Sequence, residues 1–244
     1  MSQEITKPKE TLSERIERKF LELKNLEGVQ YAFNLIRKGL AIKYPELSNK
    51  FPEVLPYHGE PHAEDVLHEA VLFALSENVT DPRELELLSL AATFHDSGFI
   101  KEYDKNEPLG ASLALEYMRQ SLHYTETEIQ RVSDIILSTE VEFDPDFRQM
   151  IRNRDDILQR IIADADVSNF GRGDFDEKAE NVFQELMGVG RIQFDTPETR
   201  DFFNRFREKM IRTHTWNTKS AHQLRDEQKK KNLQFLSDRI NKDQ

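Results

Sequence analysis

The chain has no cysteine and few glycines or prolines, and each of these absences narrows what it can be. Without cysteine there is no disulfide, no thiolate metal site and no cysteine nucleophile. Only 9 glycines and 9 prolines occur in 244 residues, which favours long helices over a β architecture with many turns. No uncharged stretch exceeds nine residues, so the sequence predicts no helix that crosses a bilayer.

The N-terminus and the net charge add further exclusions. Residues 1–4 lack the apolar core of a signal peptide, so we expect a soluble, cytoplasmic protein with no membrane partner. The formal net charge of −11 argues against a long nucleic acid as partner, because a polyanion would be repelled by most of the surface. A local basic pocket could still hold a small phosphorylated ligand, and the long last helix could mediate a homodimer.

Apolar residues recur at helical spacing along most of the chain, and capping signals mark several helix starts. The pattern predicts helices over residues 11–23, 28–44, 61–76, 82–95, 108–122, 125–139, 156–167, 174–187, 198–214 and 218–240. No useful segment alternates as a strand would. We therefore predict an all-α fold with one domain over 1–244, a core at about 57–170, a loose segment at 1–10 and C-terminal helices over 174–244.

Polar residues fall on the apolar faces of three of these helices. Leu85, Leu88 and His95 share one face, and Asp96 follows directly. His62 lies on the apolar face of the preceding helix. A single histidine in such a place is usually a hydrogen-bonded core residue, but a buried imidazole or carboxylate costs free energy unless it is paired or coordinated.

The third helix carries two aspartates, Asp164 and Asp166, on its apolar side. Together with the histidines and Asp96, they form a set of imidazoles and carboxylates. Such a set suits a divalent cation such as Mn²⁺, Fe²⁺, Co²⁺, Ni²⁺ or Zn²⁺, with Mg²⁺ favoured by carboxylates alone. The sequence therefore predicts a metal site.

The order of these residues resembles a known signature. His62, then His95 and Asp96, then Asp166 is similar to the H…HD…D pattern of the HD-domain metal-dependent phosphohydrolases, and the match runs from about Tyr57 to Phe170. Residues 57–66 are also similar to a motif that these enzymes share with cyclic-nucleotide phosphodiesterases. The resemblance implies an HD-type helical bundle and favours Asp166 over Asp164 as the fourth metal ligand.

The resemblance also implies an activity, which is hydrolysis of a phosphoester in a nucleotide or another small phosphorylated metabolite by a metal-bound hydroxide. It assigns proton donation to His58, and it implies catalytic roles for Asp96, as a ligand, and for Asp164, beside the ligands. Lys101 and Arg172 follow the motifs and could hold substrate phosphate, although solvated surface charge is the simpler interpretation of both.

One departure from the pattern leaves alternatives open. The subgroup that this chain resembles usually carries His-Glu where the chain has Asn106 and Glu107. The missing histidine favours a single metal ion over two. Two other functions therefore stay open: a metal-binding regulatory module without turnover, and an oxygenase with the HD fold and a di-iron centre.

Overall fold

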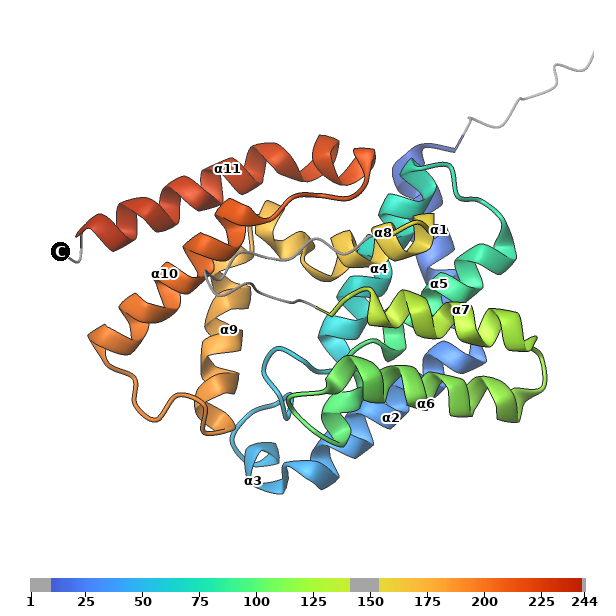
Figure 1. Cartoon of the computed structure of the whole chain (residues 1–244), viewed down its shortest axis with the longest axis horizontal. Helices are drawn as coiled ribbons and strands as arrows, with labels where there is room; N and C mark the ends of the chain where they lie inside the picture. Colours follow the sequence, from blue (N-terminus) through green and yellow to red (C-terminus); the bar gives the residue numbers. More distant parts are fainter. Residues whose placement is uncertain (1–9, 141–153, 243–244) are drawn as a thin grey trace, which may run out of the picture.

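The computed structural model describes residues 10–140 and 154–242, and within these residues it contains α-helices and short 3-10 turns but no strand (Figure 1). The predicted all-α fold is therefore confirmed. The helices are α1 (Leu12–Lys24), α2 (Glu27–Lys43), α3 (Pro45–Ser48), α4 (Glu60–Ser76), α5 (Pro82–Phe94), α6 (Asn106–Ser121), α7 (Glu126–Leu137), α8 (Ile157–Asp166), α9 (Phe175–Gly188), α10 (Pro197–Thr213) and α11 (Lys219–Lys242).

Local capping explains where several helices begin. Thr11 accepts a hydrogen bond from the backbone of Glu14, whose side chain bonds back to Thr11, and Thr125 and Glu128 repeat this capping box at α7. At α5 the side chain of Asp81 accepts from two backbone amides of the first turn. The largest departure at a helix start is at α6, which begins at Asn106 instead of residue 108. The predicted loose segment at 1–10 lies, except for residue 10, outside the described residues.

The hydrophobic core is divided unequally along the chain. One continuous cluster joins the buried faces of α1 to α8 and receives Trp216 and Ala221 from the C-terminal part. Two small clusters hold the last helices: Phe175, Ile211 and Leu236 form one, and Ala179, Phe183 and Phe203 form the other. Figure 1 shows α9, α10 and α11 gathered at one side of the larger bundle. Among the described residues, no helix is both long and apolar enough to span a membrane.

Candidate metal centre

Three helices bring the four predicted metal ligands together. His62 lies in the first turn of α4, His95 and Asp96 follow the end of α5, and Asp166 is the last residue of α8. One ligand atom from each of these side chains lies within 4.8 Å of all the others. The grouping inferred from the sequence is therefore present in the structure.

The two imidazoles direct their Nε2 atoms toward the carboxylates. Nδ1 of His95 donates a hydrogen bond to the carbonyl oxygen of Ala92 at 2.9 Å, so the proton of the neutral ring is on Nδ1 and Nε2 is free. This Nε2 is buried without a hydrogen-bond partner and lies 3.1 Å from Asp96 Oδ2 and 3.3 Å from Asp166 Oδ1. Nε2 of His62 lies 3.2 Å from the same Asp166 oxygen. Ligand atoms that face one another in this way fit a divalent cation between them.

The charges of the site agree with this geometry. Burial alone would raise the pKa of each aspartate, but the neighbouring histidines hold the pKa of Asp96 well below its ordinary value and lower that of Asp166 to about 2. Burial opposes protonation of His95, yet Asp96 and Asp166 raise its pKa well above the usual range. Two ionised carboxylates thus share one buried site, and either a proton on Nε2 of His95 or a bound cation in its place would balance their charge.

This arrangement is compatible with an HD-type site, which likewise places two histidines and two aspartates in an all-helical fold. No family model matches the chain, and a search of the curated proteins found no match either.

We call His62, His95, Asp96 and Asp166 the metal group. Beside it lies another histidine, His58, whose hydrogen-bond partner Glu185 was not singled out from the sequence. Nδ1 of His58 lies 2.5 Å from Oε1 of Glu185, and the backbone amide of His58 donates to Oε2 at 2.9 Å. Tyr103 donates to Oε1 at 2.8 Å, and the ring of Phe99 stacks on His58 with centroids 4.5 Å apart. Burial would lower the pKa of His58, but Glu185 outweighs it and raises that pKa to about 9.

Asn106 fills the position where the resembling subgroup has histidine. Its Nδ2 donates to Oδ1 of Asp96 at 2.7 Å, which leaves Oδ2 as the oxygen that faces the histidines. The contact needs close backbone packing, because a Cβ on Gly98 would come within 1.9 Å of the carbonyl oxygen of Asn106. On the next turn of α6, a Cβ on Gly110 would come within 2.4 Å of the carbonyl oxygen of Phe94 and 2.6 Å of that of His95.

Asp164 does not join the metal group, although it was expected beside the ligands. Its oxygens accept four hydrogen bonds of 2.7–2.8 Å from the backbone amides and side chains of Asn217 and Thr218. The side chain is fully buried, and these bonds tie α8 to the start of α11. The structure therefore places Asp164 in a hydrogen-bonded link between α8 and the segment before α11, and its catalytic role stays a prediction.

The two predicted phosphate-binding cations also lie elsewhere. Arg172 forms an ion pair with Asp174, lies 2.7 Å from Asp65 and is 3.7 Å from Glu69, so carboxylates already compensate its charge. Lys101 is exposed and lines a different hollow, beside α2. Neither residue lines the cavity beside the candidate ligands, which favours the simpler interpretation of both as charges without a substrate role.

A cavity of about 270 Å³ opens from the metal group. Its polar lining includes His58, Asp96, Asn106 and Asp166, and the rest of the lining comes largely from α9 and α10. Its lining residues are Tyr57, His58, Asp96, Asn106, Glu107, Thr139, Asp166, Val167, Asn169, Phe170, Phe175, Ala179, Val182, Phe203, Phe206, Arg207 and Met210.

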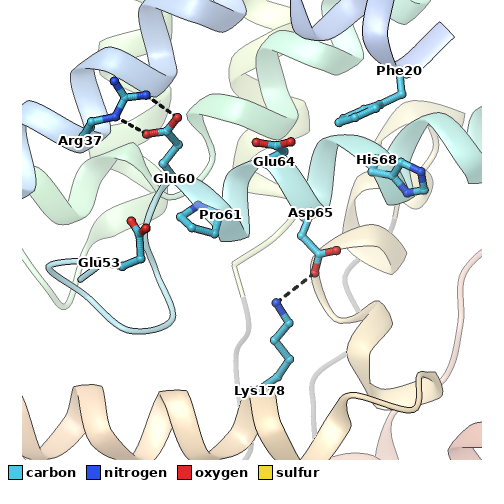
Figure 2. Close-up of a pocket in the computed structure, with 9 residues that line it drawn as sticks. All are labelled: Phe20, Arg37, Glu53, Glu60, Pro61, Glu64, Asp65, His68 and Lys178. Carbon is cyan, nitrogen blue, oxygen red and sulfur yellow. Dashed lines mark hydrogen bonds and ion pairs between the residues drawn. The ribbon is translucent and has the colours of Figure 1, made fainter. Parts of the chain in front are cut away.

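A larger hollow, of about 550 Å³, runs along the first turns of α4 (Figure 2). Figure 2 shows two of its four carboxylates beside cations: Arg37 lies 2.5 Å from Glu60, and Lys178 lies 3.7 Å from Asp65. The smaller cavity is the candidate substrate site because Asp96, Asp166 and His58 line it.

Proposed function

We propose that this chain is a metal-dependent phosphohydrolase that cleaves a phosphoester of a nucleotide or another small phosphorylated metabolite. The observation that carries the proposal is the meeting of two sets of groups at one cavity. Four candidate ligand side chains lie together, and two of them, Asp96 and Asp166, line the cavity. His58, which is held by Glu185, lines the same cavity. Bound there, a divalent cation would supply Lewis acidity toward a phosphoryl oxygen and toward water.

Proton transfer to the leaving oxygen falls to His58. Glu185 holds its Nδ1, and the raised pKa keeps the ring protonated at neutral pH. The other ring nitrogen, Nε2, is then an N–H donor on a residue that lines the cavity. When the ester bond breaks, this proton passes to the departing alkoxide, and His58 becomes neutral. Stacking on Phe99 fixes the plane of the ring.

Asn106 orients Asp96 by holding its Oδ1. Asp96 then presents Oδ2 toward His62 and His95, and Asp166 presents Oδ1 toward the same two rings. Within the described residues this is the one group of three or more such side chains close enough to hold an ion. Four ligands in one group suit one ion, whereas a di-iron centre would need more.

A regulatory module that binds metal without turnover is the second candidate. Asn106 favours it, because a neutral amide bonded to Asp96 stands where the resembling subgroup has histidine. Both candidates need the metal, and only the phosphohydrolase needs His58 as a proton donor. Turnover therefore separates them.

The test is hydrolysis of p-nitrophenyl phosphate, bis-p-nitrophenyl phosphate and a nucleotide panel with added Mn²⁺, Co²⁺ or Mg²⁺, beside Asp96→Ala. A matched control is Asp226→Asn, at an exposed carboxylate that pairs with His222. We expect activity that requires metal, vanishes in Asp96→Ala and persists in Asp226→Asn. Metal bound at one ion per chain without turnover on any substrate would contradict the phosphohydrolase and favour the regulatory module.

A further inference from the structure

The cavity has a polar lining beside the metal group and a mostly apolar lining along α9 and α10. The residues that α9, α10 and the turn before α9 contribute to it are almost all apolar: Val167, Phe170, Phe175, Ala179, Val182, Phe203, Phe206 and Met210. We call this end the phenylalanine chamber. A substrate whose phosphate lies at the metal group would place its organic part there, because both ends belong to one cavity.

One cation is buried in the wall of the phenylalanine chamber. Arg207 is only 8% exposed, and its guanidinium carbon lies 4.5 Å from the ring centroid of Phe175 and 5.6 Å from that of Phe203. Its Nη1 donates to Asn204 at 3.2 Å, and its Nη2 donates to Asp176 at 3.1 Å. Among the three nitrogens of the guanidinium, Nε is the one that is buried without a hydrogen-bond partner, which is costly unless a ligand atom accepts its N–H.

A second residue of the cavity lining, Asn169, also carries an unpaired polar atom. Oδ1 of Asn169 is buried without a hydrogen-bond partner, while its Nδ2 donates to the hydroxyl of Tyr57 at 3.4 Å. The residues that line the cavity thus include several aromatic rings, one side chain with an unpaired donor and one with an unpaired acceptor. Few polar groups and much aromatic surface are typical of a site that binds a flat ring.

We propose that the substrate is a phosphoester whose organic part is a planar ring system with at least one hydrogen-bond acceptor, held in the phenylalanine chamber. The assignment rests on the proposed phosphohydrolase function. The ring packs among the phenylalanines, and its acceptor receives the Nε–H of Arg207. A sugar phosphate would leave several hydroxyls unpaired in this chamber, and a plain alkyl phosphate would leave Arg207 unpaired. A purine nucleotide and an aryl phosphate share the required chemistry.

Binding of non-hydrolysable phosphonates tests the assignment without turnover. Calorimetry of the full chain with Mn²⁺ compares methylphosphonate, butylphosphonate, 1-naphthylmethylphosphonate and quinolinylmethylphosphonate, whose ring nitrogen is an acceptor. We expect the naphthyl compound to bind about tenfold more tightly than the butyl compound, because the ring buries more apolar surface, and the quinolinyl compound to bind more tightly again. A phosphonate analogue of adenosine monophosphate then shows whether the ring is a nucleobase or a simple aryl group.

Two variants on α9 locate the binding. Val182→Phe fills part of the phenylalanine chamber and should remove most of the ring advantage. Asn181→Leu, at the adjacent residue outside the cavity lining, should retain it. Thermal melting of both variants checks that they fold.

Equal binding of all four phosphonates, a naphthyl compound no better than butyl, or a ring advantage that survives Val182→Phe would each overturn the assignment. No gain for the quinolinyl over the naphthyl compound would overturn the role of Arg207. Ring binding at this chamber without hydrolysis of any ester would instead overturn the phosphohydrolase, so the two failures are distinguishable.

Discussion

The two parts of the molecule that meet at the cavity are built differently. The metal ligands come from α4, α5 and α8, whose buried faces share one continuous core. The chamber walls come largely from α9 and α10, which rest on small clusters and on charge pairs such as Arg200 with Glu180 and Arg207 with Asp176. The first part brings the candidate ligands together, and the second supplies most of the apolar cavity lining. The second part also supplies Glu185, which holds His58, so in the proposed function α9 would serve both the chemistry and the selectivity.

The largest expected effect comes from the metal-ligand part. His95→Ala removes a buried ligand, so we expect loss of bound metal and at least a thousandfold lower activity, because several kcal/mol of transition-state stabilisation depend on the ion. Metal content by atomic emission and hydrolysis rates measure it. His222→Ala, at an exposed histidine, is the control. Added Mn²⁺ should raise the melting temperature of the wild type and of the control only, and a variant that keeps its metal would refute the ligand role.

The next largest effect is expected from Glu185 of α9, which holds the proposed proton donor His58. Glu185→Gln should reduce activity at pH 7.5 by about 10-fold to 100-fold, because the protonated form of His58 loses its partner. In the wild type the pKa of about 9 keeps His58 protonated and active below that pH, and activity falls above it. In the variant this basic limb should move down toward about 6.5. The pH profile of kcat measures the shift.

The same pKa predicts a stability effect with a definite sign. A histidine whose pKa is raised in the folded state adds stability that is fully present below its unfolded pKa, about 6.5, and is lost as the pH rises through about 9.

The control for the activity measurement on Glu185→Gln is Glu180→Gln, which removes another carboxylate of α9, one that pairs with Arg200. An unchanged pH profile of kcat in Glu185→Gln would show that His58 is not the proton donor.

A smaller effect is expected at the contact between α6 and the metal group. Asn106→Ala removes the donor that orients Asp96, and loss of such an outer partner should weaken metal affinity about tenfold while the fold is kept. A metal titration followed by calorimetry measures it, and Asn49→Ala, at an exposed site, is the control. Tighter metal binding in Asn106→Ala would mean that the amide competes with the ion for Asp96.

The smallest effect on activity should come from Asp164, where the comparison predicts a change in stability alone. Asp164→Asn places an amide among the donors of Asn217 and Thr218, so we expect the free energy of unfolding to fall by about 2 kcal/mol. Metal content and kcat of the folded protein should stay within twofold of the wild type. Urea denaturation measures the loss, and Asp201→Asn, an exposed aspartate near the start of α10, should cause little. Loss of metal in Asp164→Asn would restore this residue to the site.

Helix positions could be predicted from the sequence because they are encoded at short range, and the candidate metal ligands because each lies on the apolar face or at the end of such a helix. Helical periodicity and capping residues act within a few positions, and His95 and Asp96 are adjacent. Asp166 needed the resemblance, since spacing alone left it equal to Asp164. What decided between them is tertiary: the donors at Asn217 and Thr218 lie more than fifty residues away in sequence.

The remaining parts of the site carried no local signal. Glu185 lies 127 residues from His58 in sequence, on a helix whose pattern shows only an amphipathic stripe. Arg207 was one of many charges in α10, and its burial depends on how α9 and α10 pack. Conversely, Lys101 and Arg172 lie next to the motifs in sequence, but the first faces another hollow and the second is held by Asp65 and Asp174. Proximity in sequence did not predict access to the cavity.

The backbone contact at Gly98 has a consequence for recognising other chains of this kind. A pattern made only of ligands, H…HD…D, describes which atoms bind but not how far α6 stands from them. Gly98 and Gly110 set that separation, because a side chain at either position would meet backbone oxygens at 1.9–2.6 Å. A search pattern that adds these two glycines and Asn106 to the four ligands would select for the close packing of α6 against the site as well as for the ligands themselves.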